Sequence, residues 1–181
     1  MKGLLLLSHD VEDVEALATR ALLIRAGFAI DTASLESTLA IKTAFGLTVQ
    51  ADCFYDSAAV NTYDLLIIPG GKYVANTIDT SPIPTIAKTF DQAHKVIAAI
   101  CAGPRFLGRA GLLDNKKYTA FPGSEIDAPK GVYINQSSTV FDGRILTAKG
   151  AGTVYQFVYQ ILKHFTSENE ATQLLSSIHH P

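Results

Sequence analysis

The stretch Lys95-Val96-Ile97-Ala98-Ala99-Ile100-Cys101-Ala102-Gly103-Pro104 decides the fold of this chain. Its apolar run, Val96–Ile100, is typical of a strand that is buried on both faces. The run stops at Cys101, after which Gly103 allows a tight turn and Pro104 suits the first turn of a helix. The sequence therefore predicts a strand, a cysteine and a helix in direct succession, with Cys101 at the carboxyl end of the strand.

A cysteine in this position has two interpretations. Unpaired N–H groups and the dipole of the following helix favour negative charge, which predicts a thiol pKa below its reference of ~8.5 and a reactive Cys101. A cysteine that ends an apolar strand is also often no more than a packing residue. The pattern alone leaves both readings open.

Strand and helix patterns alternate along the whole chain. Strands are predicted at Gly3–Ser8, Ala29–Leu35, Leu65–Pro69, Val96–Ile100, Tyr118–Phe121 and Val132–Asn135, and helices at Glu12–Ala26, Pro82–His94, Val154–His164 and Glu168–Ile178. A small hairpin or an extension of the sheet edge is expected within Thr43–Phe54, a helical turn over Asp56–Asn61, and a tight hairpin around Asp142-Gly143. The prediction is one α/β domain over residues 1–181, with a mainly parallel sheet between helices on both faces and a small hairpin.

Composition excludes several classes of function. The 181 residues hold 15 basic and 17 acidic side chains, without a basic stripe, so no nucleic-acid partner is expected. Cys53 and Cys101 form no CxxC motif and no Cys/His cluster at zinc spacing, so neither a disulfide nor a metal site is predicted. The apolar start Leu4–Leu7 meets Asp10 too early for a signal peptide, and no run approaches the ~20 residues of a membrane helix. We expect a cytoplasmic protein without a membrane partner.

Several chemically useful residues follow predicted strands. His9, Gly70-Gly71, Cys101, Phe121 and Gly150-Ala151-Gly152 all stand at carboxyl ends, where ligands bind in open α/β sheets. A Gly-Gly pair presents backbone N–H groups to an anion, although Pro-Gly-Gly also serves as a plain turn. A histidine in such a loop is commonly only solvated. The convergence nevertheless favours a functional Cys101.

Together these residues resemble the ThiJ/PfpI superfamily, in particular its redox-sensing deglycase branch. The most specific piece is Ala98–Pro104, supported by Ile67–Gly71, by Ile24–Gly27 and by Leu146-Thr147 before the glycine loop. The resemblance covers nearly the whole chain. It implies a flavodoxin-like three-layer sandwich and a homodimer formed through the first helix, where we expect Arg25 at the contact.

The resemblance also implies roles for single residues. Cys101 matches the nucleophilic or redox-active cysteine of the family, and Glu15 matches an acidic residue that stays protonated and donates a hydrogen bond to the thiolate. Gly71 and Ala102 match positions whose backbone N–H groups line an anion pocket. Gly70 belongs to the same expected pocket. No metal and no organic cofactor are implied.

Two positions depart from the family pattern. Branches with peptidase activity carry a histidine directly after the nucleophile, where this chain has Ala102. The deglycase branch carries a histidine before the proline that matches Pro122, where this chain has Phe121. The loss of that imidazole predicts weakened proton transfer, worth typically 10²–10⁴-fold, with His9 as the first candidate to replace it.

These residues support two functions of different kinds. The first is an enzyme of the glyoxalase or protein deglycase type, which attacks small carbonyl compounds or glycated protein through Cys101 with help from Glu15. The alternative is a redox sensor or chaperone-like stress protein, in which Cys101 is oxidised to sulfinate. A glutamine amidotransferase shares the elbow but needs a late His and Glu, and no His-x-Glu follows Cys101.

Overall fold

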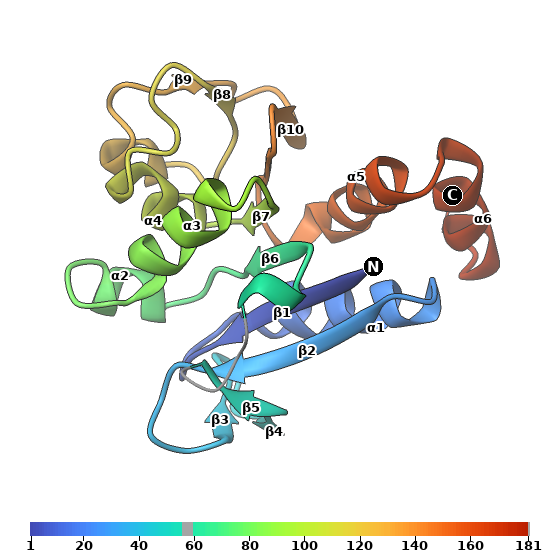
Figure 1. Cartoon of the computed structure of the whole chain (residues 1–181), viewed down its shortest axis with the longest axis horizontal. Helices are drawn as coiled ribbons and strands as arrows, with labels where there is room; N and C mark the ends of the chain where they lie inside the picture. Colours follow the sequence, from blue (N-terminus) through green and yellow to red (C-terminus); the bar gives the residue numbers. More distant parts are fainter. Residues whose placement is uncertain (56–59, 181) are drawn as a thin grey trace.

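The computed structural model describes residues 1–55 and 60–180, and a seven-stranded sheet runs through them (Figure 1). In spatial order its strands are β10 (Thr139–Asp142), β11 (Ile145–Ala148), β7 (Val96–Ile100), β6 (Leu65–Ile68), β1 (Lys2–Leu7), β2 (Ala29–Ser34) and β5 (Cys53–Phe54). All neighbouring strands are parallel except β10 and β11, which form the hairpin predicted around Asp142-Gly143. The predicted α/β class is confirmed.

Helices cover the sheet on both faces (Figure 1). One layer contains the π-helical turn η1 (Val14–Ala18), α1 (Thr19–Arg25), α5 (Val154–Phe165) and α6 (Glu168–Ser177). The other contains α2 (Tyr73–Thr77), α3 (Ile83–Gln92) and α4 (Pro104–Arg109). The longer helices bury one stripe each at helical spacing: in α5, for example, the buried side chains are Val154, Phe157, Val158, Ile161 and Leu162.

The three central strands are buried along almost their whole length. Every residue of β6 and β7 is buried, as is β1 from Gly3 onward. Continuous burial explains why these strands have uninterrupted apolar sequences rather than alternating ones.

The order of connection places a crevice beside β1. After β1 the chain builds β2 and β5 on one side, and then returns to build β6, β7 and β11 on the other. The strand order therefore reverses between β1 and β6, and ligands of doubly wound folds bind outside the carboxyl ends of the strands at such a point.

Smaller elements differ in part from the prediction. A hairpin of β3 (Ala40–Lys42) and β4 (Thr48–Gln50) has Gly46 at a φ of 92° in its turn, but its first strand lies before the predicted range Thr43–Phe54. The end of that range is β5, which extends the edge of the main sheet. The predicted strand Tyr118–Phe121 is wrong beyond Tyr118. Strand β8 (Lys117–Tyr118) pairs with β9 (Val132–Tyr133), and the next backbone N–H, that of Thr119, donates at 2.9 Å to the side-chain hydroxyl of Thr147 on β11 instead of to a backbone carbonyl. Most of the helical turn predicted at Asp56–Asn61 lies outside the described residues, which resume with η3 (Val60–Thr62).

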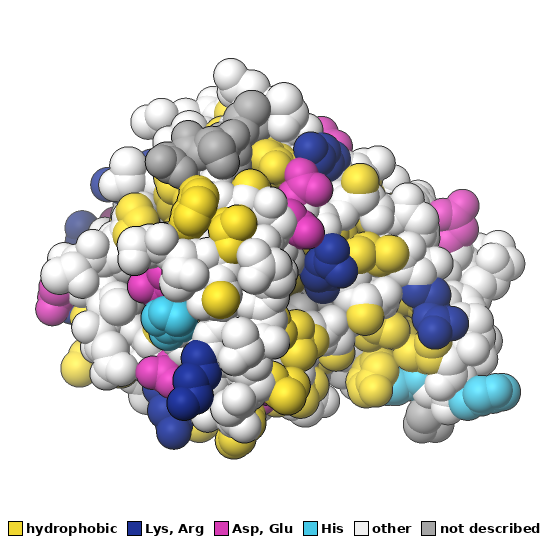
Figure 2. Space-filling model, turned by 90° about the horizontal axis from the view of Figure 1, so that it is seen from below, with side chains coloured by type: hydrophobic (Ala, Val, Ile, Leu, Met, Phe, Trp, Pro, Cys, Tyr) yellow, Lys and Arg dark blue, Asp and Glu magenta, His cyan; other side chains and the backbone are white. Residues whose placement is uncertain are grey.

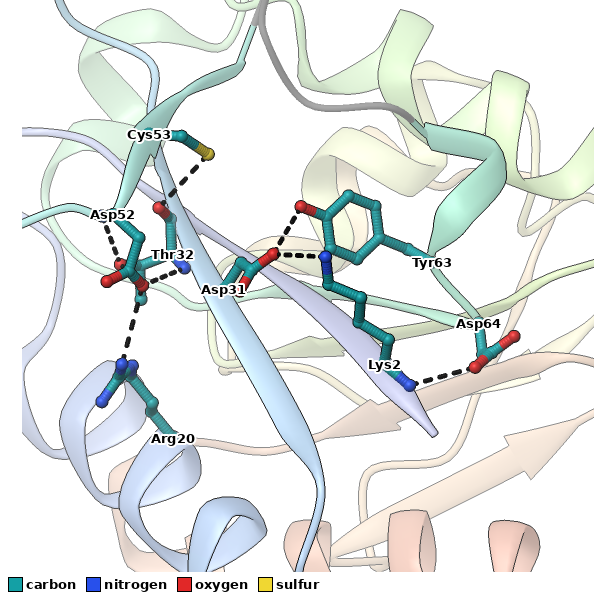
Figure 3. A network of polar contacts seen from close by, with 8 residues as sticks. All are labelled: Lys2, Arg20, Asp31, Thr32, Asp52, Cys53, Tyr63 and Asp64. Carbon is teal, nitrogen blue, oxygen red and sulfur yellow. Dashed lines mark hydrogen bonds and ion pairs between the residues drawn. The ribbon is translucent and has the colours of Figure 1, made fainter.

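A polar network ties the β2 side of the sheet together (Figure 3). The Lys2 ammonium and the Tyr63 hydroxyl both donate to the Asp31 carboxylate at 2.8 Å. Nearby, the Asp52 carboxylate accepts from the backbone N–H and the hydroxyl of Thr32, at 2.8 and 2.7 Å. These bonds join β1 to β2, and β2 to the segment that leads into β5.

Charges are mixed on the face drawn in Figure 2, where acidic and basic side chains are scattered among neutral and apolar ones. Within the described part of the chain, no helix is both long enough and apolar enough to span a lipid bilayer.

Candidate active site

Cys101 lies on a strained turn between β7 and α4. Its φ is 62°, a left-handed conformation that non-glycine residues rarely adopt and that typically costs about 1–3 kcal/mol. The turn is fixed from both sides, because the Cys101 N–H donates to Ala148 and its carbonyl accepts from the N–H of Phe121, at 2.9 and 2.8 Å. Strain held in place by its surroundings is common at functional sites.

Glu15 reaches the same point from η1, the π-helical turn that follows β1. Its side chain is only 1% exposed, and its Oε2 accepts a hydrogen bond from the Gly70 N–H at 2.8 Å. The backbone of Ala151 donates to the same carboxyl group, and the carboxyl group is hydrogen-bonded to the Cys101 thiol. A buried carboxyl group and a thiol, from chain segments far apart in sequence, thus form one bonded pair.

The absence of a side chain at Gly70 makes this pairing possible. A Cβ atom there would stand 2.6 Å from the Cβ of Cys101 and 2.7 Å from Oε2 of Glu15, closer than real Cβ contacts. Gly71 meets a similar constraint: its φ is 129°, and a Cβ would be 2.3 Å from the Asp10 carbonyl oxygen. The Gly-Gly sequence after β6 is therefore a close-approach element rather than a plain turn.

Burial governs the protonation of the pair. It raises the pKa of Glu15 from 4.5 to about 7, against the lowering effect of the hydrogen bonds from Cys101 and Gly70. Burial also raises the pKa of the Cys101 thiol, and the negative charge of an ionised Glu15 raises it further, while the Ala102 N–H acts in the opposite direction. The lowered thiol pKa predicted from the turn alone is wrong, because burial and the adjacent carboxyl group outweigh the N–H groups.

The pair opens into a cleft of about 450 Å³. Of the residues predicted at this end of the sheet, Cys101, Glu15, Phe121, Gly150, Ala151 and Gly152 line it. The sequence did not indicate the other lining residues, Glu12, Pro122, Lys149 and Thr153. Gly70 packs directly against Cys101 and Glu15, and Gly71 and Ala102 follow in sequence beside them. The Glu12 carboxylate accepts from the N–H of Glu15 at 2.7 Å and so fixes the first turn of η1.

His9 is not among the residues that line the cleft, and its predicted place in the pocket is wrong. The Nδ1 atom of its imidazole accepts a hydrogen bond from the backbone N–H of Lys42 at 3.1 Å, and the backbone N–H of His9 donates to the Glu36 carboxylate at 3.1 Å. These bonds hold the exposed imidazole against β3. The loop after β1 thus sends Glu15, not His9, into the site.

Within residues 1–55 and 60–180, no group of three or more His, Cys, Asp or Glu side chains could hold a metal ion.

The raised pKa of Glu15 predicts a specific pH dependence of stability. The folded protein keeps its proton up to about pH 7 whereas the unfolded chain releases it near 4.5, so stability falls as pH rises between these values. The shift of about 2.5 units corresponds to roughly 3 kcal/mol. Chemical denaturation at several pH values should show this loss in the wild type and not in Glu15→Gln. The surface variant Glu170→Gln is the control, and identical pH profiles for wild type and Glu15→Gln would contradict the assignment.

Comparison with known proteins identifies the family. Residues 1–164 match the model of the DJ-1/PfpI family. The chain is 27% identical to the glutathione-independent glyoxalase DJR-1.2 of Caenorhabditis elegans, over 97% of this chain and 94% of the relative, and 29% identical to a deglycase of Pyrococcus horikoshii, over 90% and 98%. The solved structure of oxidized DJ-1 from Toxoplasma gondii superposes with a TM-score of 0.86 at 28% identity, covering 98% of this chain and 97% of that one. The chain belongs to the DJ-1/PfpI family.

Proposed function

We propose that this protein is an enzyme that acts on small reactive carbonyl compounds, of the glyoxalase or deglycase type, through Cys101 and Glu15. The observation that carries the proposal is the buried Glu15 carboxyl group, with a pKa near 7, hydrogen-bonded to a thiol at the base of an open cleft. A pKa near the working pH is the value that suits a group which must both give and take a proton. The names of the glyoxalase and deglycase relatives support the same reaction class.

In the proposed reactive state one proton resides on Glu15 and the negative charge on Cys101. Two like charges in a buried pair are unfavourable, so one group keeps a proton. Oε2 of Glu15 already accepts from Gly70, which leaves Oε1 to carry that proton and to donate to the sulfur. Burial still raises the thiol pKa when Glu15 is neutral, but the charge of Glu15 no longer adds to that effect, and the Ala102 N–H favours the thiolate.

The first chemical step is addition to the aldehyde. The thiolate forms a C–S bond to the carbonyl carbon, the π electron pair moves to oxygen, and the oxygen takes the Glu15 proton to give a hemithioacetal. The backbone N–H groups of Gly71 and Ala102 are assigned to the developing oxyanion. With a 2-oxoaldehyde, the carboxylate of Glu15 then takes the proton from the former aldehyde carbon and returns it to the neighbouring carbon, while the proton of the new hydroxyl moves to the neighbouring carbonyl oxygen. The product is a thioester, which water cleaves to a 2-hydroxy acid and the free thiol.

Turnover of methylglyoxal to lactate without glutathione tests this proposal. Cys101→Ser should abolish turnover, and Glu15→Gln should lower kcat by about 10²–10⁴-fold because it removes the proton carrier. Cys53→Ser is the matched control and should keep the wild-type rate. Wild-type protein without turnover, or Cys101→Ser with full turnover, would refute the enzymatic function.

Phe121 should limit this chemistry. The resemblance matches Phe121 to a histidine of the deglycase branch, so in the proposed reaction Glu15 alone acts as both acid and base. Phe121→His should raise methylglyoxal turnover by ~10-fold, and Val132→His, at an exposed position on β9, should not. An unchanged rate in Phe121→His would show that no proton carrier is missing.

The redox function remains the second candidate, favoured by the donors around the sulfur. Two molecules of peroxide would each transfer one oxygen atom to Cys101 and leave as water, and the sulfinate would accept hydrogen bonds from Glu15 and Ala102. This reaction needs no shuttle, so Phe121→His should leave it unchanged. Rapid gain of two oxygen atoms at Cys101 in a protein that does not turn over methylglyoxal would favour this function.

We also propose a cytoplasmic homodimer that contacts its partner through the first helix. Apolar side chains are exposed on η1 and on the β3–β4 turn: Val14 is 48%, Phe45 76% and Leu47 56% exposed. The Asp13 carboxylate joins the two elements, because it accepts from the N–H of Phe45 at 3.2 Å. Arg25 is exposed at the end of α1, and we propose that it also contacts the partner.

Light scattering at micromolar concentration should give twice the mass of the chain. Phe45→Glu should shift the protein toward a monomer because it places a charge in the apolar contact, whereas Val132→Glu should not. A wild-type monomer would rule out the dimer.

A further inference from the structure

One wall of the cleft is an exposed aromatic ring. Phe121 is 54% exposed and lines the same cleft as Cys101, and its backbone N–H donates to the Cys101 carbonyl at 2.8 Å. Exposed Pro122 continues this wall. Gly150 lies close to the ring, because a Cβ atom there would be 3.8 Å from Cδ2 of Phe121. The rest of the ring is exposed, so a second flat group can pack against it from the cleft.

The cleft is larger than the smallest carbonyl substrates. Its volume of about 450 Å³ lies in the range of sites that bind drug-sized ligands. Around Gly152, nothing lies within 4 Å of the position that a Cβ would occupy. A three-carbon dicarbonyl compound would leave most of this space, and the exposed ring, in contact with water.

The aromatic wall is anchored to the helix that follows the nucleophile. The Asp127 side chain, only 6% exposed, accepts hydrogen bonds from Nε of Arg105 at 2.5 Å and from Nε of Arg109 at 2.6 Å. Both arginines belong to α4, and Asp127 ends η4 (Ser124–Asp127), the turn that follows Phe121 and Pro122. A Cβ at Gly108 would stand 2.3 Å from the Asp127 carbonyl oxygen, so the η4 backbone lies directly on α4.

We propose that the cleft selects carbonyl compounds with a flat apolar substituent, such as an aryl 2-oxoaldehyde, that packs against Phe121, and that Asp127 is a positioning residue for this wall. The inference rests on the proposed function, because it assumes that the carbonyl group is attacked by Cys101. An aromatic pair gains stabilisation beyond simple burial of area, and displaced water adds to it. In this proposal the ion pairs of Asp127 hold the ring at a fixed distance from the sulfur. A rigid wall selects substituents by their shape, because it does not rearrange to fit them.

Two maleimides that differ only in one substituent test the selection without any turnover. N-phenylmaleimide and N-methylmaleimide react alike: the thiol sulfur bonds to one alkene carbon, and a proton adds to the other. Labelling rates at Cys101 are measured by peptide mass spectrometry, which separates Cys101 from Cys53. The phenyl-to-methyl rate ratio is then divided by the same ratio for glutathione, so that intrinsic reactivity cancels.

The expected ratio for wild-type Cys101 is about 5–10-fold above glutathione. Phe121→Ala should bring it within about twofold of glutathione, and Val132→Ala should leave it at the wild-type value. Asp127→Asn should lower it at least threefold in protein that is still folded by circular dichroism, and Asp127→Glu should restore part of it. A general loss of stability would not move this ratio, so the ratio separates a positioning role from a merely structural one.

A wild-type ratio equal to that of glutathione, or a raised ratio that survives Phe121→Ala, would overturn the inference. An unchanged ratio in folded Asp127→Asn would remove the positioning role of Asp127. Protein that shows the phenyl preference but turns over no 2-oxoaldehyde would refute the proposed function alone. Failure of Cys101 to react with either maleimide would refute both.

Discussion

The site depends on the close approach of three strand ends at Gly70. The loop after β1 brings Glu15, the loop after β7 brings Cys101, and the loop after β6 must pass between them without a side chain. Any Cβ at that position would overlap both partners. The parallel sheet supplies this convergence, because the carboxyl ends of neighbouring parallel strands meet at one edge and the strand order reverses beside β1.

The close approach also explains the electrostatics. A carboxyl group that is 1% exposed loses its hydration, and two backbone N–H groups, from Gly70 and Ala151, replace only part of it. The pKa of Glu15 is therefore near 7 instead of the ordinary value of 4.5. Because the thiol is bonded to this carboxyl group, the two groups form one coupled titrating unit, and the chemistry of Cys101 depends on the proton of Glu15. The strained φ of Cys101 holds the sulfur in that contact.

Much of the fold was predictable from local sequence. Continuous apolar runs predicted β6 and β7, and Asp142-Gly143 predicted the β10–β11 hairpin, because these patterns depend only on residues that are neighbours in sequence. The site was less accessible. The raised thiol pKa follows from burial against a distant carboxyl group, and the end of β8 follows from a bond of Thr119 to another strand. Likewise, the ion pairs of Asp127 with Arg105 and Arg109 join residues about twenty positions apart, which no local pattern reveals. The role of Glu15 could be predicted only from the resemblance to a known family.

The most direct measurement of the central claim is the infrared spectrum of the carboxyl group as a function of pH. A protonated carboxyl group in a dry site has a C=O band that is distinct from those of the carboxylate and the amide. One such band should persist at pH values at which ordinary Glu side chains are already ionised, disappear near pH 7 and be absent from Glu15→Gln. Substitution of Cys101 by Ser should shift this band, since the two groups are bonded. A Glu15 band that is lost near pH 4.5 and does not shift in Cys101→Ser would contradict the coupling of the carboxyl group to the thiol.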